Sequence, residues 1–181
     1  PGSFWAACQS LYFIFLVLPD SPGRPDYVLR PFFQRDRGAR RLDEDEAREL
    51  LSCLWIKLFD VIGSQDSRSG ANHLVLGGQT GSGDDASSDL TRLCLDVTEA
   101  LRLPRPQVSL RWHKRMDRAV LRRAVQVLRN NTGQPSFLND ESIIPALERI
   151  GTEREDARNY SVSGCSEIII TGMSNMGSVE G

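Results

Sequence analysis

The chain has 181 residues, which is enough for one domain of ordinary size with a sizeable core. Its hydrophobic content of 40% and its charged content of 25% are typical of a soluble globular protein. The formal net charge of -2 gives no electrostatic reason to expect binding to nucleic acid or to an anionic membrane.

Residues 1–19 carry no charge and include the apolar run FWAACQSLYFIFLVL. A helix that crosses a membrane needs about 20 apolar residues, and Gln9 and Ser10 interrupt this run in its middle. The run also lacks the basic start and the small-residue cleavage site of a secretory signal. We therefore predict a buried core helix here and no membrane insertion.

The sequence next predicts a loop and a long amphipathic helix. Prolines and Gly23 break regular structure at residues 19–26 (PDSPGRPD), and Asp43 then begins a helix with Glu46 as its capping-box partner. The apolar residues of this helix recur at helical spacing and give it one buried face: Ala47, Leu50, Leu51, Leu54, Leu58 and Val61. Residues 64–72 are polar and typical of a loop.

Short apolar strands alternate with helices from residue 73 onwards. The expected strands are residues 73–78, 107–112, 136–139 and 160–164. The expected helices are residues 86–101, a segment from Asp117 to about residue 129, and residues 142–150. This alternation indicates βαβ units and a mainly parallel sheet. About four such units are too few to close a barrel, so we expect an arc of a larger structure with exposed sheet edges.

The ends of the expected strands supply the candidates for a substrate pocket, because working residues of α/β proteins lie at the C-terminal ends of strands. These candidates are His113, Asn139, Asp140 and Gly164. Helix capping explains Asn139 and Asp140 equally well, and an ordinary structural histidine is the simpler interpretation of His113. The basic run from Arg111 to Arg123 is expected to be a solvated helix face with i,i+4 pairs.

Four cysteines lie far apart, without a CxxC pair: Cys8, Cys53, Cys94 and Cys165. This spacing argues against a zinc site and against a small secreted disulfide scaffold, and it favours a reducing cytoplasmic location. His73 and His113 have no acidic or cysteine partner at metal-ligand spacing, so no metal site is expected.

The loop GGQTGSGDDAS places Gly81, Gly83 and Ala86 at the GxGxxA spacing of dinucleotide-binding loops, after a strand and before a helix. Asp84 and Asp85 would repel a pyrophosphate at that helix N-terminus, and no acidic residue ends the next strand. A tight turn whose aspartates cap the following helix is therefore the preferred interpretation.

The stretch SVSGCSEIII, residues 161–170, places Cys165 among small residues at a strand end and Glu167 two positions later. A lone cysteine beside an apolar run is more often part of a core. In an extended chain, however, both side chains would lie on one face, where the carboxylate can act as a base. This pairing suits a thiol that transfers a hydrogen atom and a glutamate that moves a proton. A Cys–His hydrolase would instead need His113 close to the thiol.

A series of sequence blocks, in order along the chain, resembles the glycyl radical enzymes, the family of pyruvate formate-lyase, glycerol and choline lyases and related eliminases. The blocks are SFWAACQSLYFIF, GRPDYVLRPFFQRD, ARELLSCLWIK, LVLGGQTGSGDDASSDLTRLCLDV, PQVSLRWHK, GQPSFLNDE and ARNYSVSGCSE. The resemblance implies an α/β fold, the ten-stranded β/α barrel built from two antiparallel five-stranded half-barrels. Residues 1–181 would be a central, incomplete part of this barrel domain, without the C-terminal glycine radical domain.

The resemblance also implies roles for the residues of the GCSE motif. Cys165 would become a thiyl radical on a loop inside the barrel, and Glu167 would be the base of the family's GCxE motif. The radical would be stored on a backbone glycine outside this chain, so no cofactor is bound directly. The implied partners are a small hydroxylated substrate, an activating enzyme that uses S-adenosylmethionine and an iron–sulfur cluster, and a second copy of the chain in a homodimer.

Departures from the family pattern bear on the reaction. Gly164 and Ser166 flank a single cysteine where pyruvate formate-lyase has two adjacent cysteines, which disfavours acyl transfer to coenzyme A. We therefore expect a lyase that eliminates a group next to a hydroxyl-bearing carbon. The alternatives are a formate acetyltransferase or decarboxylase of the same family, and an inactive fragment that only packs or binds. The start without Met and the ending GSVEG suggest two cut ends, so this piece alone is expected to be inactive.

Overall fold

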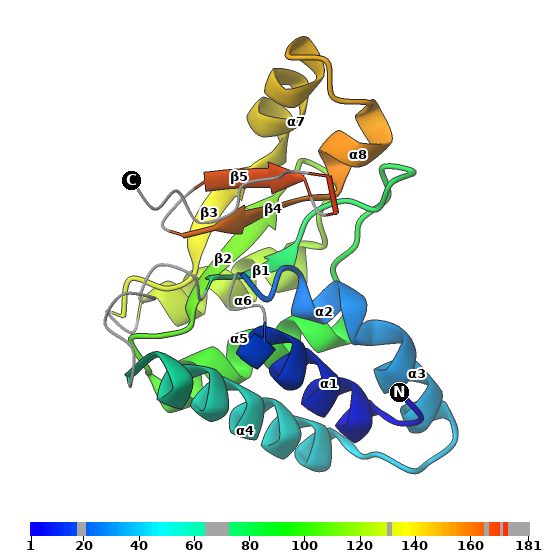
Figure 1. Cartoon of the computed structure of the whole chain (residues 1–181), viewed down its shortest axis with the longest axis vertical. Coiled ribbons are helices and arrows are strands. Elements are labelled where there is room, and N and C mark those ends of the chain that lie inside the picture. The colour runs from blue at the N-terminus through cyan, green and yellow to red at the C-terminus, as the bar shows by residue number, and fades with distance from the viewer. Residues whose placement is uncertain (18–20, 64–72, 130–131, 165–166, 171, 174–181) are drawn as a thin grey trace.

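A computed structural model of the chain describes residues 1–17, 21–63, 73–129, 132–164, 167–170 and 172–173 (Figure 1). The N-terminal part consists of the helices α1 (Phe4–Val17), α2 (Pro25–Val28), α3 (Arg30–Gly38) and α4 (Glu44–Gly63). The remainder contains β1 (His73–Gly77), α5 (Asp89–Leu101), β2 (Gln107–Trp112), α6 (Arg118–Leu128), β3 (Ser136–Asn139), α7 (Asp140–Arg149), α8 (Arg154–Arg158), β4 (Tyr160–Ser163) and β5 (Glu167–Ile170). The predicted loop at residues 64–72 lies outside the described residues.

Strands β1, β2 and β3 form a parallel sheet in that order. His73 pairs with Gln107, and Ser109 of the central strand pairs with Ser136. Parallel neighbours need long crossover connections, and α5 and α6 provide them. The predicted βαβ units are therefore confirmed.

The last predicted strand does not extend this parallel sheet. β4 pairs with β5 in an antiparallel hairpin, with Tyr160 opposite Ile170 and Ser163 opposite Glu167. Only residues 164–166 separate the two strands, a connection that is too short for a parallel crossover but suitable for a hairpin. The apolar run after Glu167, for which no secondary structure was predicted, is the second strand of this hairpin.

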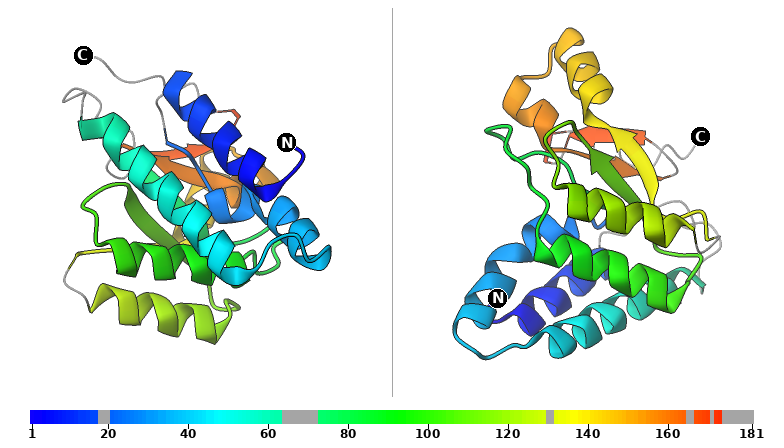
Figure 2. Two further views of the ribbon diagram at one scale, coloured as in Figure 1. Left: turned by 90° about the horizontal axis from the view of Figure 1, so that it is seen from below. Right: turned by 180° about the vertical axis from the view of Figure 1, so that it is seen from behind.

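The two faces of the parallel sheet differ in chemistry. Side chains alternate along a strand, and one face contributes apolar residues to the main core: Leu74, Leu76, Val108 and Leu110. Helices α4, α5 and α6 stack on this side (Figure 2). The opposite face carries the polar side chains of His73, Ser109, Arg111 and Ser136. The β4–β5 hairpin lies on that polar face (Figure 1).

Helix α4 begins with the predicted capping box. The Asp43 carboxylate accepts from the Glu46 backbone at 2.8 Å, and the Glu46 carboxylate accepts from the Asp43 backbone at 3.0 Å. Its predicted apolar face is also confirmed, because these residues are buried against the core: Ala47, Leu51, Leu54 and Leu58.

Helix α1 differs from the buried core helix that was predicted. Phe4 and Phe15 are buried, but Phe13 and Val17 are 56% and 78% exposed. The run is apolar all round, so periodicity could not show that only one side packs against α4. Among the described residues, no helix combines the length and the hydropathy that crossing a membrane requires.

Helix α2 begins inside the predicted loop of residues 19–26, and α3 follows it at Arg30. Pro25 and Pro31 occupy the first turns of these helices, where a missing backbone N–H costs little. The prolines therefore start helices rather than exclude them.

We predict that Leu58→Ala lowers the free energy of unfolding by about 2–5 kcal/mol, because it leaves a cavity under α4. Ile56→Ala on the exposed side of the same helix is the matched control and should change it by less than about 1 kcal/mol. Urea unfolding of both variants measures the difference. Equal losses would contradict the assignment of the buried face.

Candidate active site

The predicted radical cysteine lies in sequence between the two strands of the β4–β5 hairpin. β4 ends at Ser163 and β5 begins at Glu167, and these two residues are paired. Gly164 opens the turn, whereas Cys165 and Ser166 lie outside the described residues. Chain connectivity thus places Cys165 between Gly164 and Glu167, and the geometry of those two residues defines the candidate site.

The Glu167 side chain folds back over the backbone of Gly164. A Cβ atom built on Gly164 would lie 2.3 Å from Glu167 Oε2, closer than any real contact. Gly164 also has a φ of +54°, in the left-handed region that favours glycine. The positive φ disfavours a side chain here, whereas the Glu167 carboxylate is the far end of a flexible, exposed side chain that could move aside. In this structure the turn brings that carboxylate against the residue that precedes Cys165.

A buried histidine from β1 reaches the same turn. His73 Nδ1 lies 3.2 Å from the Gly164 carbonyl oxygen, and its Nε2 lies 2.6 Å from Ser109 Oγ. Ser109 Oγ is in turn 2.5 Å from Ser136 Oγ. Burial lowers the pKa of His73 below 6.5, Arg105 lowers it further, and the Gly164 carbonyl and Glu167 oppose this shift.

His73 was predicted to be an ordinary structural histidine, and sequence gave little sign of its contact with the turn. The one available signal was Ser109 in the middle of the strand QVSLRW, on the polar side of its alternation. A polar residue on a buried strand needs a partner, and here that partner is His73.

The start of the hairpin is fixed by a buried ion pair. Arg111 donates through Nε and Nη2 to the two carboxylate oxygens of Asp140, each at 2.9 Å. Its Nη1 donates to the Tyr160 carbonyl at 2.8 Å, and its guanidinium lies 3.8 Å from the centre of the Tyr160 ring. The Tyr160 hydroxyl donates to Asp140 Oδ1 at 2.7 Å. Tyr160, the first residue of β4, is therefore locked beside β2.

These contacts set the direction of β4. The strand starts beside Arg111, near the C-terminal end of β2, and ends beside His73, the first residue of β1. The C-terminal end of β4 thus lies at the N-terminal end of the parallel sheet. The predicted pocket candidates consequently separate into two places, with Gly164 and Glu167 at one end and His113 and Asp140 at the other.

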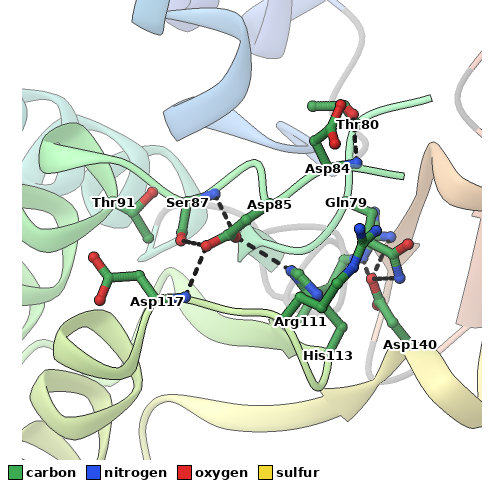
Figure 3. Close-up of polar contacts among 12 residues, drawn as sticks. Gln79, Thr80, Asp84, Asp85, Ser87, Thr91, Arg111, His113, Asp117 and Asp140 are labelled. Carbon is green, nitrogen blue, oxygen red and sulfur yellow. Dashed lines mark hydrogen bonds and ion pairs between the residues drawn. The ribbon is translucent and has the colours of Figure 1, made fainter. Parts of the chain in front are cut away.

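The structure decides between the two interpretations of Asn139 and Asp140 at the end of β3. Asn139 is the N-cap of α7, accepting from the Glu141 backbone at 3.0 Å, as the capping alternative predicted. Asp140 serves neither as a cap nor as a free pocket ligand, because Arg111 holds its carboxylate (Figure 3). The Tyr160 hydroxyl also donates to it.

The basic run from Arg111 to Arg123 is a solvated helix face only in part, at the exposed Arg118 and Arg122 of α6. Arg111 is buried on a strand, because the run begins inside β2. Arg123 on α6 forms ion pairs with Asp96 and Glu99 of α5, so its contacts join two helices rather than following i,i+4 spacing.

His113 forms a polar cluster with Asp85 at the C-terminal end of β2. Its Nε2 lies 3.2 Å from Asp85 Oδ1, and Asp85 also accepts from the backbones of Ser87 and Asp117 (Figure 3). These contacts lower the pKa of Asp85 despite its partial burial. The prediction that this aspartate caps α5 is therefore wrong, since Ser88 is the N-cap residue and Asp85 joins the loop to α6.

An open cavity of about 470 Å³ lies beside this cluster. It is lined by Gln79, His113 and Asp140, together with charged residues of α7 and α8 such as Glu148, Arg154 and Arg158. Gly164 and Glu167 do not line it. The cavity and the cysteine turn are therefore separate features of this chain.

The other cysteines are poor candidates for chemistry. Burial raises the pKa of Cys8 to about 12 and raises that of Cys94 as well, so neither thiol ionises readily. Cys53 is exposed on α4. Across the described residues, no three His, Cys, Asp or Glu side chains cluster closely enough to hold a metal ion.

A protein-family model described as pyruvate formate lyase-like matches residues 1–179 of the chain. The chain is 34% identical to an isethionate sulfite-lyase of Desulfovibrio desulfuricans over 91% of its length, and it spans 22% of that relative. It is 36% identical to a probable dehydratase of Escherichia coli over 95% of its length, spanning 24% of it.

Solved structures give the same result for the fold. The chain matches a structure from work on 1,2-propanediol dehydration in Roseburia inulinivorans with a TM-score of 0.85, 37% identity and 93% of the chain covered. It matches the B12-independent glycerol dehydratase of Clostridium butyricum with a TM-score of 0.84, 32% identity and 94% covered. In both cases it spans 23% of the solved chain, in agreement with the predicted incomplete barrel.

Arg111→Met should lower the free energy of unfolding by about 3–5 kcal/mol, because it leaves the Asp140 charge buried without its partner. Arg154→Met breaks the exposed pair with Glu148 and should change it little. Chemical unfolding of both variants tests this difference. Arg111→Met combined with Asp140→Leu should recover part of the loss, and no recovery would contradict the explanation by an unpaired charge.

The lowered pKa of His73 predicts a pH dependence of stability. The unfolded chain binds this proton more readily than the folded chain, so the stabilisation is complete above about pH 6.5 and is lost as the pH falls through the lower folded pKa. His73→Asn removes the titrating group. The unfolding free energy of the parent should therefore decline more steeply than that of the variant between about pH 7 and pH 5. Equal slopes of unfolding free energy against pH for the parent and His73→Asn would contradict a lowered pKa of His73.

Proposed function

Because this chain belongs to the pyruvate formate-lyase-like family of glycyl radical enzymes, we propose that it is part of a radical lyase acting on a small hydroxylated molecule. The chain spans about a quarter of the relatives it matches, so the activity belongs to a longer protein of which these residues form the central barrel part. The names of those relatives support elimination, since sulfite-lyases and dehydratases both release a group from a neighbouring carbon.

The observation that carries the proposal is the position of the β4–β5 turn. It holds Cys165 in sequence between Gly164 and Glu167, and the Glu167 carboxylate folds against Gly164. A thiol and a carboxylate on one tight turn can reach the same substrate carbon and its hydroxyl. Buried partners at both ends of β4 fix that turn relative to the sheet, as a reaction between precisely placed atoms requires.

In the proposed reaction, the Cys165 thiyl removes a hydrogen atom from the hydroxyl-bearing carbon, forming an S–H bond and leaving a carbon radical. Glu167 takes the hydroxyl proton, and the resulting ketyl radical expels the neighbouring leaving group with its electron pair. The product radical then recovers the hydrogen atom from Cys165, which regenerates the thiyl. A radical stored on a glycine outside this chain supplies the unpaired electron for each round.

Radical chemistry also requires exclusion of solvent and oxygen. The three isoleucines of β5 follow Glu167 directly and are partly buried, and Ile168 and Ile170 pack against the apolar cluster around Tyr160. The rest of the enclosure is expected from the longer protein. The partners expected are a small-molecule substrate, a radical-generating activating enzyme and a second copy of the protein in a homodimer, in the cytoplasm.

Cys165→Ala in the activated full-length protein should abolish turnover, because it removes the atom that exchanges hydrogen with substrate. Glu167→Gln should leave radical formation intact but stop elimination, because the amide cannot take the hydroxyl proton. Electron paramagnetic resonance measures the radical, and product analysis with isethionate, glycerol, 1,2-propanediol and trans-4-hydroxy-L-proline measures turnover. Full activity of either variant would contradict the proposal, and formate exchange into pyruvate would favour the acyltransferase alternative.

A further inference from the structure

The hydrogen-bond chain under the turn has a defined proton arrangement. The Gly164 carbonyl oxygen can only accept, so the Nδ1 atom of His73 that faces it must carry a proton. In the neutral ring Nε2 is then an acceptor, and the Ser109 hydroxyl donates to it. Because the Ser109 hydroxyl proton is already donated to His73, the Ser109 oxygen accepts a hydrogen bond from the Ser136 hydroxyl. The Gly164 carbonyl therefore selects a single tautomer of His73, and the hydroxyls of Ser109 and Ser136 orient to match it.

Burial keeps the His73 ring neutral near pH 7. The charge of this ring is important because the Glu167 carboxylate is close enough to interact with it electrostatically. The charged groups that act on His73 are Arg105, which precedes β2, and Glu167 of β5. A positive imidazolium beside Glu167 would stabilise the carboxylate and weaken it as a base. A neutral histidine avoids this effect while still donating a hydrogen bond to the turn.

The Gly164 carbonyl is the point where this hydrogen bond controls the site. It belongs to the planar peptide unit that joins Gly164 to Cys165, so a donor on the oxygen restrains the orientation of the whole unit. The Glu167 carboxylate lies close to the same glycine. One hydrogen bond from the sheet thus restrains the backbone against which the proposed base lies.

We propose that His73, oriented by Ser109, is a positioning residue that fixes the position of Gly164 against the sheet. It thereby sets how Glu167 approaches the substrate. This inference rests on the proposed function, in which Glu167 is the base. His73 itself touches no reacting atom in this proposal.

Three variants of the full-length protein separate positioning from general stability. His73→Leu removes the donor, whereas His73→Asn retains an N–H group near the place of Nδ1. Ser109→Ala keeps the imidazole but removes the hydroxyl that donates to its Nε2. His113→Asn is the matched control, a buried histidine changed at the other end of the sheet.

Hydrogen–deuterium exchange of the peptide that spans residues 160–170 is the first measurement, because it needs no substrate. His73→Leu should speed exchange there on the order of tenfold, Ser109→Ala by less, and His73→Asn and His113→Asn hardly at all. Unchanged exchange in His73→Leu, or equal acceleration in His73→Leu and His73→Asn, would overturn the inference. If His73→Leu does not fold, Ser109→Ala is judged by the same criterion.

Kinetics then tests the consequence for catalysis, using whichever of the four compounds named above is turned over fastest. His73→Leu should lower kcat on the order of 10- to 100-fold with little change in KM, and His73→Asn should restore most of it. A kcat for His73→Leu equal to that of the parent would overturn the inference. Cys165→Ala separates the test of the proposed function from the test of His73. Turnover by Cys165→Ala would contradict the proposed function, whereas the exchange result concerns the role of His73 alone.

Discussion

The buried ion pair between Arg111 and Asp140 is the contact on which the arrangement of the site depends. Both side chains are fully shielded from solvent, and such a pair offsets its desolvation only when hydrogen bonds satisfy the remaining donors and acceptors. Here the guanidinium also donates to the carbonyls of Tyr160 and Arg158, and the Tyr160 hydroxyl donates to Asp140. We infer that the pair specifies one arrangement of β2, α7 and β4 more than it adds to stability.

The same guanidinium explains Gly78, the second of the paired glycines at the end of β1. A Cβ atom on Gly78 would lie 2.6 Å from Arg111 Nε, and Gly78 has a φ of +78°. A side chain there would therefore displace the arginine from Asp140. The glycine-rich loop that resembles a nucleotide-binding motif is thus shaped in part by packing against a buried arginine, and Arg158 closes the loop further by donating to the Gly81 carbonyl.

The sequence predicted the elements of the fold better than the assembly of the site. Periodicity and capping residues located β1 to β3, α4 and α6, because each depends on neighbours in the chain, such as Asp43 with Glu46 or Asp117 at the start of α6. The direction of β4 depends on the contact of Arg111 with Tyr160, which are far apart in the sequence. For that reason the sequence grouped Gly164 with His113 and missed His73. The resemblance to a family identified the turn itself, which no spacing rule could have done.

The account is tested most directly by a crystal structure of the full-length protein with a substrate bound. It predicts that Cys165 Sγ faces the hydroxyl-bearing carbon inside a closed cavity, that the Glu167 carboxylate accepts from the hydroxyl, and that the Gly164 carbonyl remains bonded to His73. A sulfur packed among core side chains, with Glu167 turned to bulk water on the far side, would contradict it.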